Sequence, residues 1–188
     1  MNLGLHSSDS GRTGQERMSM DPKDIAILTL QLRRPPRAIA EVVTRCGDGH
    51  PAVIRTPPLA PDKHGVLLPM PTLYWLTCPA LRRAVSRIEE RGAVSEFEAR
   101  IASDPEFRSQ YLEAHERYRA TRSRTMTEAD RALIEAQGFA EAFASRGIGG
   151  LGNPLAVKCL HLHLAHHLAE ENPIGRVLIQ EMGVQLCP

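Results

Sequence analysis

The fold class is indicated most clearly where the sequence reads TLYWLTCPALRRAVSRI, residues 72–88. Residues 72–77 form a β-branched and aromatic run, which is typical of a strand. From Pro79 onward, apolar residues recur at the spacing of a helix that buries one face. They are Leu81, Val85 and Ile88. This change of pattern within a few residues predicts a domain that contains both strands and helices.

Short strand-like runs also precede this segment. They cover residues 42–43, 52–54 and 66–68. Turn and proline-rich sequences separate them, which predicts a small antiparallel meander of two or three strands within residues 41–78. Pro69 and Pro71 restrict the third run to an edge of the sheet or to a bulge, because proline cannot donate a backbone hydrogen bond.

Most of the remaining sequence has helical patterns. A first helix is expected after the capping residue Asp21, and it ends at Pro35-Pro36. Of the later helices, one is expected to end at Gly92, and the next contains Phe97 and Ile101. A third begins at Asp104, and a fourth runs from Thr127 towards Ala144. The last two run from about Leu155 to Ala169 and from Pro173 to Met182. The predicted fold is therefore α+β, a mainly helical single domain over residues 21–188 with a small meander. Residues 1–20 are polar and rich in glycine and serine, which predicts a disordered tail.

Two of the expected helices carry aromatic and charged residues that are given no functional role. Tyr111 and Tyr118 lie on one apolar face of the helix expected after Asp104, so they are expected in the core or half-buried. His115 of the same helix is expected at the surface. Glu89 lies among arginines on the helix expected to end at Gly92, where charges of both signs predict a solvated face.

The charge balance excludes several classes of partner. The chain has 23 basic and 22 acidic residues, so its formal net charge is +1, and all but 3 of the basic residues are arginine. Such a chain is not expected to bind nucleic acid or an acidic membrane surface. Aromatic residues make up 4%, too few for a platform on which single strands stack. A protein partner stays possible.

The compartment expected from the sequence is the cytoplasm. The N-terminal segment has no apolar stretch typical of a secretory signal, and no part of the chain approaches the roughly 18 apolar residues of a membrane span. In the cytoplasm, cysteines are expected as reduced thiols or metal ligands rather than disulfides. The four cysteines are Cys46, Cys78, Cys159 and Cys187.

The densest group of metal-binding side chain types lies in VKCLHLHLAHHL, residues 157–168. On a helix, Cys159, His163 and His166 fall within a stripe about 60° wide, because successive residues are about 100° apart. A thiolate and two imidazoles at this spacing can converge on one zinc ion, which takes four such ligands. The same pattern also fits histidines that face solvent beside a small buried thiol.

Two other cysteines could complete this set. Cys46 lies in a tight turn, Cys-Gly-Asp-Gly, and Cys78 lies at the corner between the last strand and the first helix after it. Both are too distant in sequence from Cys159 to form a local zinc knuckle with it, so their convergence depends on the fold.

Two further interpretations involve the same region. The loop at residues 147–152 contains four glycines and precedes an expected helix, whose N-terminus would favour an anion such as phosphate. A flexible connector is the simpler interpretation of this loop. Cys159 or Cys78 could instead be the nucleophile of a small hydrolase, activated by a histidine. The sequence therefore leaves open whether the protein is an enzyme.

Several motifs together resemble those of a known family. They are Arg45-Cys46-x-x-Gly49-x-Pro51, Pro71-Thr72-Leu73-Tyr74-x-Leu76-Thr77-Cys78-Pro79, Val157-Lys158-Cys159-Leu160-His161, Ala165-His166 and Asn172-Pro173. Their order and spacing, over roughly residues 22–180, resemble the bacterial family called domain of unknown function 501. The resemblance implies an uncharacterised cytoplasmic protein of a kind common in actinobacteria.

The resemblance also selects candidate ligands. Cys46, Cys78, Cys159, His161 and His166 occupy motif positions of the family. Three cysteines with one or two histidines are a familiar zinc complement, so the resemblance implies a zinc-binding domain of structural or regulatory role. An iron–sulfur cluster is the alternative cofactor, because it too is held by cysteine with an occasional histidine.

Overall fold

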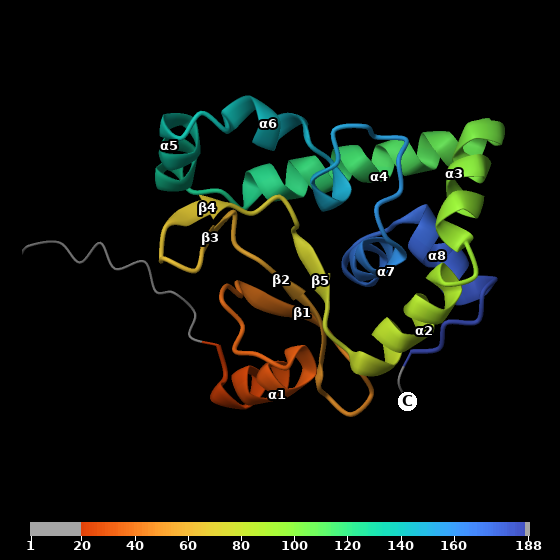
Figure 1. Ribbon diagram of the computed structural model, residues 1–188, viewed down its shortest axis with the longest axis horizontal. Coiled ribbons are helices and arrows are strands. Elements are labelled where there is room, and N and C mark those ends of the chain that lie inside the picture. The colour runs from red at the N-terminus through yellow and green to blue at the C-terminus, as the bar shows by residue number, and fades with distance from the viewer. Residues whose placement is uncertain (1–19, 187–188) are drawn as a thin grey trace, which may run out of the picture.

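The computed structural model describes residues 20–186. This part of the chain contains eight α-helices and two small antiparallel sheets, so the predicted α+β class is confirmed (Figure 1). The helices are α1 (Pro22–Leu32), α2 (Pro79–Glu89), α3 (Ala93–Ser103), α4 (Pro105–Arg124), α5 (Glu128–Ala136), α6 (Ala140–Ser145), α7 (Leu160–Ala169) and α8 (Pro173–Gln180), with a 3-10 turn η1 (Ile148–Gly150). The strands are β1 (Glu41–Arg45), β2 (Pro51–Arg55), β3 (Leu59–Pro61), β4 (Leu67–Pro69) and β5 (Tyr74–Leu76). The tail predicted over residues 1–20 lies outside the described residues except for Met20.

The larger sheet is formed by three of the strand-like runs predicted within residues 41–78, whereas the run at residues 66–68 lies in the smaller sheet. Its strand order is β1-β2-β5, and both pairings are antiparallel. Val53 of the central strand β2 pairs with Thr44 of β1 on one side and with Leu76 of β5 on the other. β5 is an edge strand of this sheet. β3 and β4 form a separate two-stranded sheet between β2 and β5 in the sequence.

Side-chain caps fix the beginnings of four helices. Asp21, Asp104 and Asn172 each accept a hydrogen bond from a backbone N–H in the first turn that follows. Thr127 and Asp130 form a reciprocal capping box at the start of α5. These short polar residues satisfy backbone donors that no helical carbonyl can reach, so the predicted helix starts at these points are confirmed.

The single helix expected from Thr127 towards Ala144 is wrong. The chain breaks at Gly138, whose φ of 74° is left-handed, and this residue separates α5 from α6. Glycine adopts this conformation at no steric cost, which is why it so often ends a helix.

The helix expected from about Leu155 begins later, at Leu160. Residues 156–158 form hydrogen bonds with other parts of the chain. The Tyr111 hydroxyl donates to the Ala156 carbonyl at 2.9 Å, and the Val157 N–H donates to the Glu98 carboxylate at 3.0 Å. Cys159 is the extended residue before the helix, with φ −162° and ψ 150°, so it does not share the helical stripe of the histidines.

Helix α7 lies at the centre of the molecule, in contact with β5, α2 and α8 (Figure 1). Its residues Leu160, Leu164 and Ala165 are completely buried. His163 and His166 of the same helix are also buried, so their stripe faces the core and not the solvent. The central helix is therefore covered on several sides, and its histidines are placed by the core.

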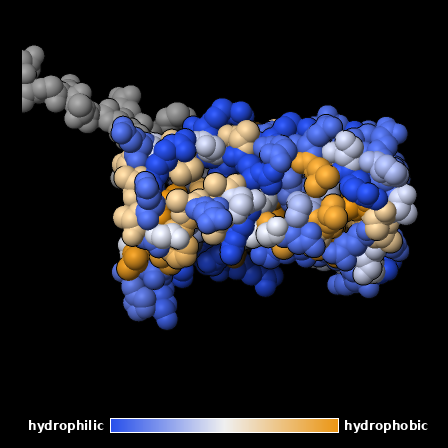
Figure 2. Space-filling view, turned by 90° about the horizontal axis from the view of Figure 1, so that it is seen from above, coloured by the Kyte–Doolittle hydropathy of each residue, from blue (hydrophilic) through white to orange (hydrophobic). Residues whose placement is uncertain are grey.

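The surface formed by α3 to α6 is mostly hydrophilic, with small separate hydrophobic patches (Figure 2). Within residues 20–186, no helix is long and apolar enough to cross a membrane.

Candidate metal centre

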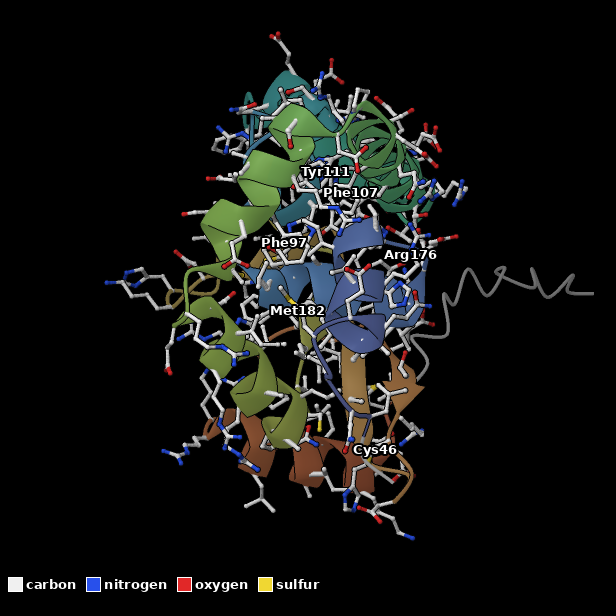
Figure 3. All side chains as sticks on the ribbon, turned by 90° about the vertical axis from the view of Figure 1, so that its right-hand side faces the viewer. Cys46, Phe97, Phe107, Tyr111, Arg176 and Met182 are labelled. Atoms are coloured by element: carbon white, nitrogen blue, oxygen red, sulfur yellow. The ribbon has the colours of Figure 1, made fainter. Side chains whose placement is uncertain are left out.

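The structure divides the predicted ligands among four places. Cys46 lies in the turn between β1 and β2, Cys78 caps α2, Cys159 and His161 lie together at the start of α7, and His166 lies in the core. Cys46 lies near the end of the molecule formed by α1 (Figure 3), and it belongs to a different group of neighbouring ligand atoms from Cys159 and His161. The five residues therefore do not surround one point.

Within the described residues, two groups hold three metal-binding side chains whose ligand atoms all lie within 4.8 Å of one another. They are Cys46–Asp48–His50 and Glu89–Cys159–His161. The first group lies within one exposed turn, closed by the Cys46 N–H donating to the His50 carbonyl at 2.9 Å. The second is assembled from two different helices and is partly buried.

Cys78 belongs to the core. Its side chain is buried in the main apolar cluster, and its backbone N–H donates to the Ala52 carbonyl at 3.3 Å. This residue joins the sheet to α2, which begins at Pro79.

His166 is held by the protein at both ring nitrogens. Nδ1 lies 3.2 Å from the Asn172 amide nitrogen, and Nε2 lies 3.5 Å from the Glu170 carboxylate. Because the Asn172 oxygen accepts from the Gly175 N–H, its amide nitrogen must be the donor to Nδ1. The ring also stacks on Tyr74, with 5.8 Å between the ring centres. His166 thus accepts at Nδ1 and donates at Nε2, which leaves it no lone pair for a metal.

His163, which the helical stripe offered as a zinc ligand, lies buried near His115 instead. His115 was expected at the surface, but it is 1% exposed. Its Nδ1 accepts from the Ile148 N–H at 3.3 Å, and Nδ1 of His163 lies 3.3 Å from the donating Asn172 amide. Burial lowers the pKa of His115 to about 4 and that of His163 to about 3. Both rings are therefore neutral with the proton on Nε2, and neither Nε2 has a hydrogen-bond partner among the described residues.

The glycine loop has a packing role. A Cβ on Gly147 would lie 1.9 Å from Nδ1 of His115, and one on Gly149 would lie 2.5 Å from the Leu162 side chain. The loop ends well before α7 begins at Leu160. It is therefore not joined to a helix N-terminus, and the anion cradle expected over residues 147–152 is not formed there.

The partly buried group Glu89–Cys159–His161 lies where the end of α2 meets the start of α7. Glu89 is the last residue of α2, and its carboxylate accepts from the Leu160 N–H, so it caps α7 from outside. Either carboxylate oxygen also lies 3.2 Å from Nδ1 of His161. Cys159 immediately precedes the helix.

The His161 ring lies between two acceptors. Nε2 is 3.1 Å from the Arg82 carbonyl oxygen and 3.3 Å from the Ser86 hydroxyl, and Nδ1 faces the Glu89 carboxylate. A carbonyl can only accept, so Nε2 carries a proton and a neutral ring turns its Nδ1 lone pair towards the carboxylate. The Nδ1 lone pair and the carboxylate oxygen are both acceptors and lie 3.2 Å apart, so a cation is needed between them, which is either a proton or a metal ion.

The Cys159 thiol is placed for ligation by the same backbone. Burial raises its pKa, while the backbone N–H groups of Leu162 and His161 lower it and the Glu89 charge raises it further. The net effect keeps the sulfur protonated when no cation is near. A metal ion reverses this, because a coordinating thiol is deprotonated.

The comparisons with known proteins give a family. A family model described as a protein of unknown function, DUF501, matches residues 42–180. No curated protein and no solved structure matches the chain. All three members of the Glu89–Cys159–His161 group lie within the matched residues. The match covers well over half of the chain, and the protein therefore belongs to the DUF501 family of proteins of unknown function.

Proposed function

We propose that this protein is a zinc-binding domain and that Cys159, His161 and Glu89 hold the metal. The observation that carries the proposal is that Nδ1 of His161 and the Glu89 carboxylate, both acceptors, face each other, because a metal on Nδ1 satisfies the ring and the carboxylate together. The 3.2 Å between Nδ1 and the carboxylate oxygen is close to the separation of about 3.4 Å that tetrahedral zinc imposes on nitrogen and oxygen ligands.

The partners around the three ligands also support this proposal. The Arg82 carbonyl holds the far nitrogen of His161 as a donor, which is how ligating histidines are usually oriented. The N–H groups that lower the pKa of Cys159 stabilise its thiolate. An iron–sulfur cluster fits this group less well, since it takes four soft ligands and the group supplies one thiolate and one imidazole.

Three protein ligands leave one position of tetrahedral zinc for water or a bound molecule. The metal would also tie the end of α2 to the start of α7, the helix at the centre of the fold. The domain would thus need zinc for stability and keep one coordination position open, which suits a regulatory or catalytic use of the metal.

An activated thiol is the second candidate function. Cys159 and His161 lie close enough to be a nucleophile and its base, but the two ring nitrogens of His161 face the Glu89 carboxylate and the Arg82 carbonyl, so no triad is formed. The raised pKa of Cys159 opposes this function, because a nucleophilic cysteine needs a low pKa.

Metal analysis of the protein purified without a chelator tests the proposal. We expect stoichiometric zinc in the wild type and in Cys46→Ser, and little zinc in Cys159→Ser. The Cys46 variant is the matched control, because it alters the exposed Cys46–Asp48–His50 group instead. A metal-free wild type, or equal zinc in wild type and Cys159→Ser, would overturn the proposal. Rapid alkylation of Cys159 in a metal-free wild type would favour the thiol instead.

A further inference from the structure

A polar groove of about 580 Å³ lies between the C-terminal end of α1 and the exposed face of α2. Four arginines line it, together with His161 and a single acidic residue, Glu90. The arginines are Arg33, Arg82, Arg83 and Arg87. The groove therefore carries a local excess of positive charge on a chain whose net charge is +1.

These four arginines are not neutralised by the protein. All four are exposed, and within residues 20–186 none of them forms an ion pair. Among the other described arginines, some form ion pairs, as in Arg45–Asp24 at 2.7 Å and Arg55–Glu41 at 2.7 Å. Like charges gathered in one groove repel each other, and a bound anion removes that repulsion.

We propose that this groove binds a small phosphate-bearing anion, such as a phosphate ester or a diphosphate. The guanidinium group presents its N–H donors in a planar fork that matches phosphate oxygens, and charge-assisted bonds of this kind are stronger than neutral ones. The volume lies within the range of about 300–1,000 Å³ typical of small-molecule sites. A nucleic acid would need a longer basic surface than this single groove on a nearly neutral chain.

The groove adjoins the proposed zinc ligands through His161. Ser86 and Arg82, which contact Nε2 of that ring, both line the groove. A phosphate in the groove would therefore lie beside the Nε2 edge of His161, opposite the Nδ1 edge that faces the proposed metal. This last step rests on the proposed function, but binding of the anion by the arginines does not.

Calorimetric titration with inorganic pyrophosphate tests the inference on zinc-loaded and on chelator-treated protein. We expect binding in both forms, weakened about tenfold or more in the double variant Arg83→Ala/Arg87→Ala. The side chains of Arg83 and Arg87 are exposed, so the double variant is expected to fold, and a thermal melt checks this. Arg91→Ala is the matched control, because Arg91 is an exposed arginine just beyond α2 that does not line the groove.

Three outcomes would overturn the inference. The first is no binding of pyrophosphate to either form, and the second is equal weakening by Arg91→Ala and by the double variant. The third is tighter binding of a single-stranded oligonucleotide than of pyrophosphate, with the same dependence on Arg83 and Arg87. If metal analysis finds no zinc in the purified protein but pyrophosphate still binds, the groove is supported and the zinc proposal fails, so the two failures are distinguishable.

Discussion

Nδ1 of His161 lies 3.2 Å from the carboxylate of Glu89, although 72 positions separate the two residues in the sequence. The contact joins the last residue of α2 to the first turn of α7, directly beside the Cys159 thiol. The carboxylate has two roles here, because it also accepts the Leu160 N–H at the start of α7. One side chain thus both caps the helix and faces the candidate metal.

Glu89→Gln separates these two roles. The amide oxygen can still accept from Leu160, but the negative charge that faces Nδ1 is lost. We expect zinc affinity to fall by at least the 10–100-fold that is typical for loss of an outer-shell partner, since Glu89 is a proposed ligand. Competition with a chromogenic zinc chelator measures this. Glu90→Gln is the control, and equal affinities in the two variants would exclude Glu89 as a ligand.

Chelation should lower the melting temperature of the wild type. A bound metal stabilises the folded state, and a loss of about 2 kcal/mol corresponds to about 4–8 °C for a chain of this size. The same shift is expected in Cys46→Ala, and none in Cys159→Ala. If chelator leaves all three melts unchanged, Cys159 is a packing residue only.

The buried histidines make stability dependent on pH. Burial lowers the pKa of His163 to about 3 and that of His115 to about 4, below the value near 6.5 that they have in the unfolded chain. The unfolded chain therefore binds more protons as the pH falls below 6.5, so stability is complete above that pH and is lost towards pH 4. Each histidine contributes a loss of about 2 kcal/mol between pH 6.5 and pH 5.

Urea unfolding at several pH values checks this dependence in wild type and His163→Gln. The variant should lose less stability on acidification, whatever its absolute stability. His64→Gln, which alters an exposed histidine, should keep the wild-type slope. Identical slopes in all three proteins would contradict a neutral His163 in the core.

Gly147 is expected to be the least replaceable glycine of the loop at residues 147–152. A methyl group there would collide with Nδ1 of His115, which accepts from the Ile148 N–H. Gly147→Ala should therefore cost about 1–3 kcal/mol, as overpacking usually does. Gly152→Ala meets nothing within 4 Å and should be close to neutral. Similar urea midpoints for the two variants would show that His115 is not packed against this loop.

Much of the fold can be predicted from local sequence signals. Caps such as Asp21 and Thr127 act on backbone groups a few residues away, and β-branched and aromatic runs indicate the strands, so these features were predictable. The start of α7 was not, because Tyr111 and other distant residues hold the chain extended before Leu160. A helical pattern contains no information about such tertiary hydrogen bonds.

The candidate site was predictable in part. Cys159 and His161 were selected from the sequence, and the structure places them together. Glu89 was expected on a solvated face, because the charges around it alternate in sign and its partner lies on another helix. His115 was expected at the surface for a related reason: Gly147, which makes room for its ring, is distant in the sequence.

X-ray absorption spectroscopy at the zinc edge tests the central claim most directly. The account predicts one sulfur at about 2.3 Å, with nitrogen and oxygen ligands at about 2.0–2.1 Å. Because Cys46–Asp48–His50 offers the same donor types, the spectrum must be recorded for variants as well. The sulfur shell should persist in Cys46→Ser and disappear in Cys159→Ser. A sulfur shell that persists in Cys159→Ser, or a wild-type site without sulfur, would contradict zinc binding by Cys159, His161 and Glu89.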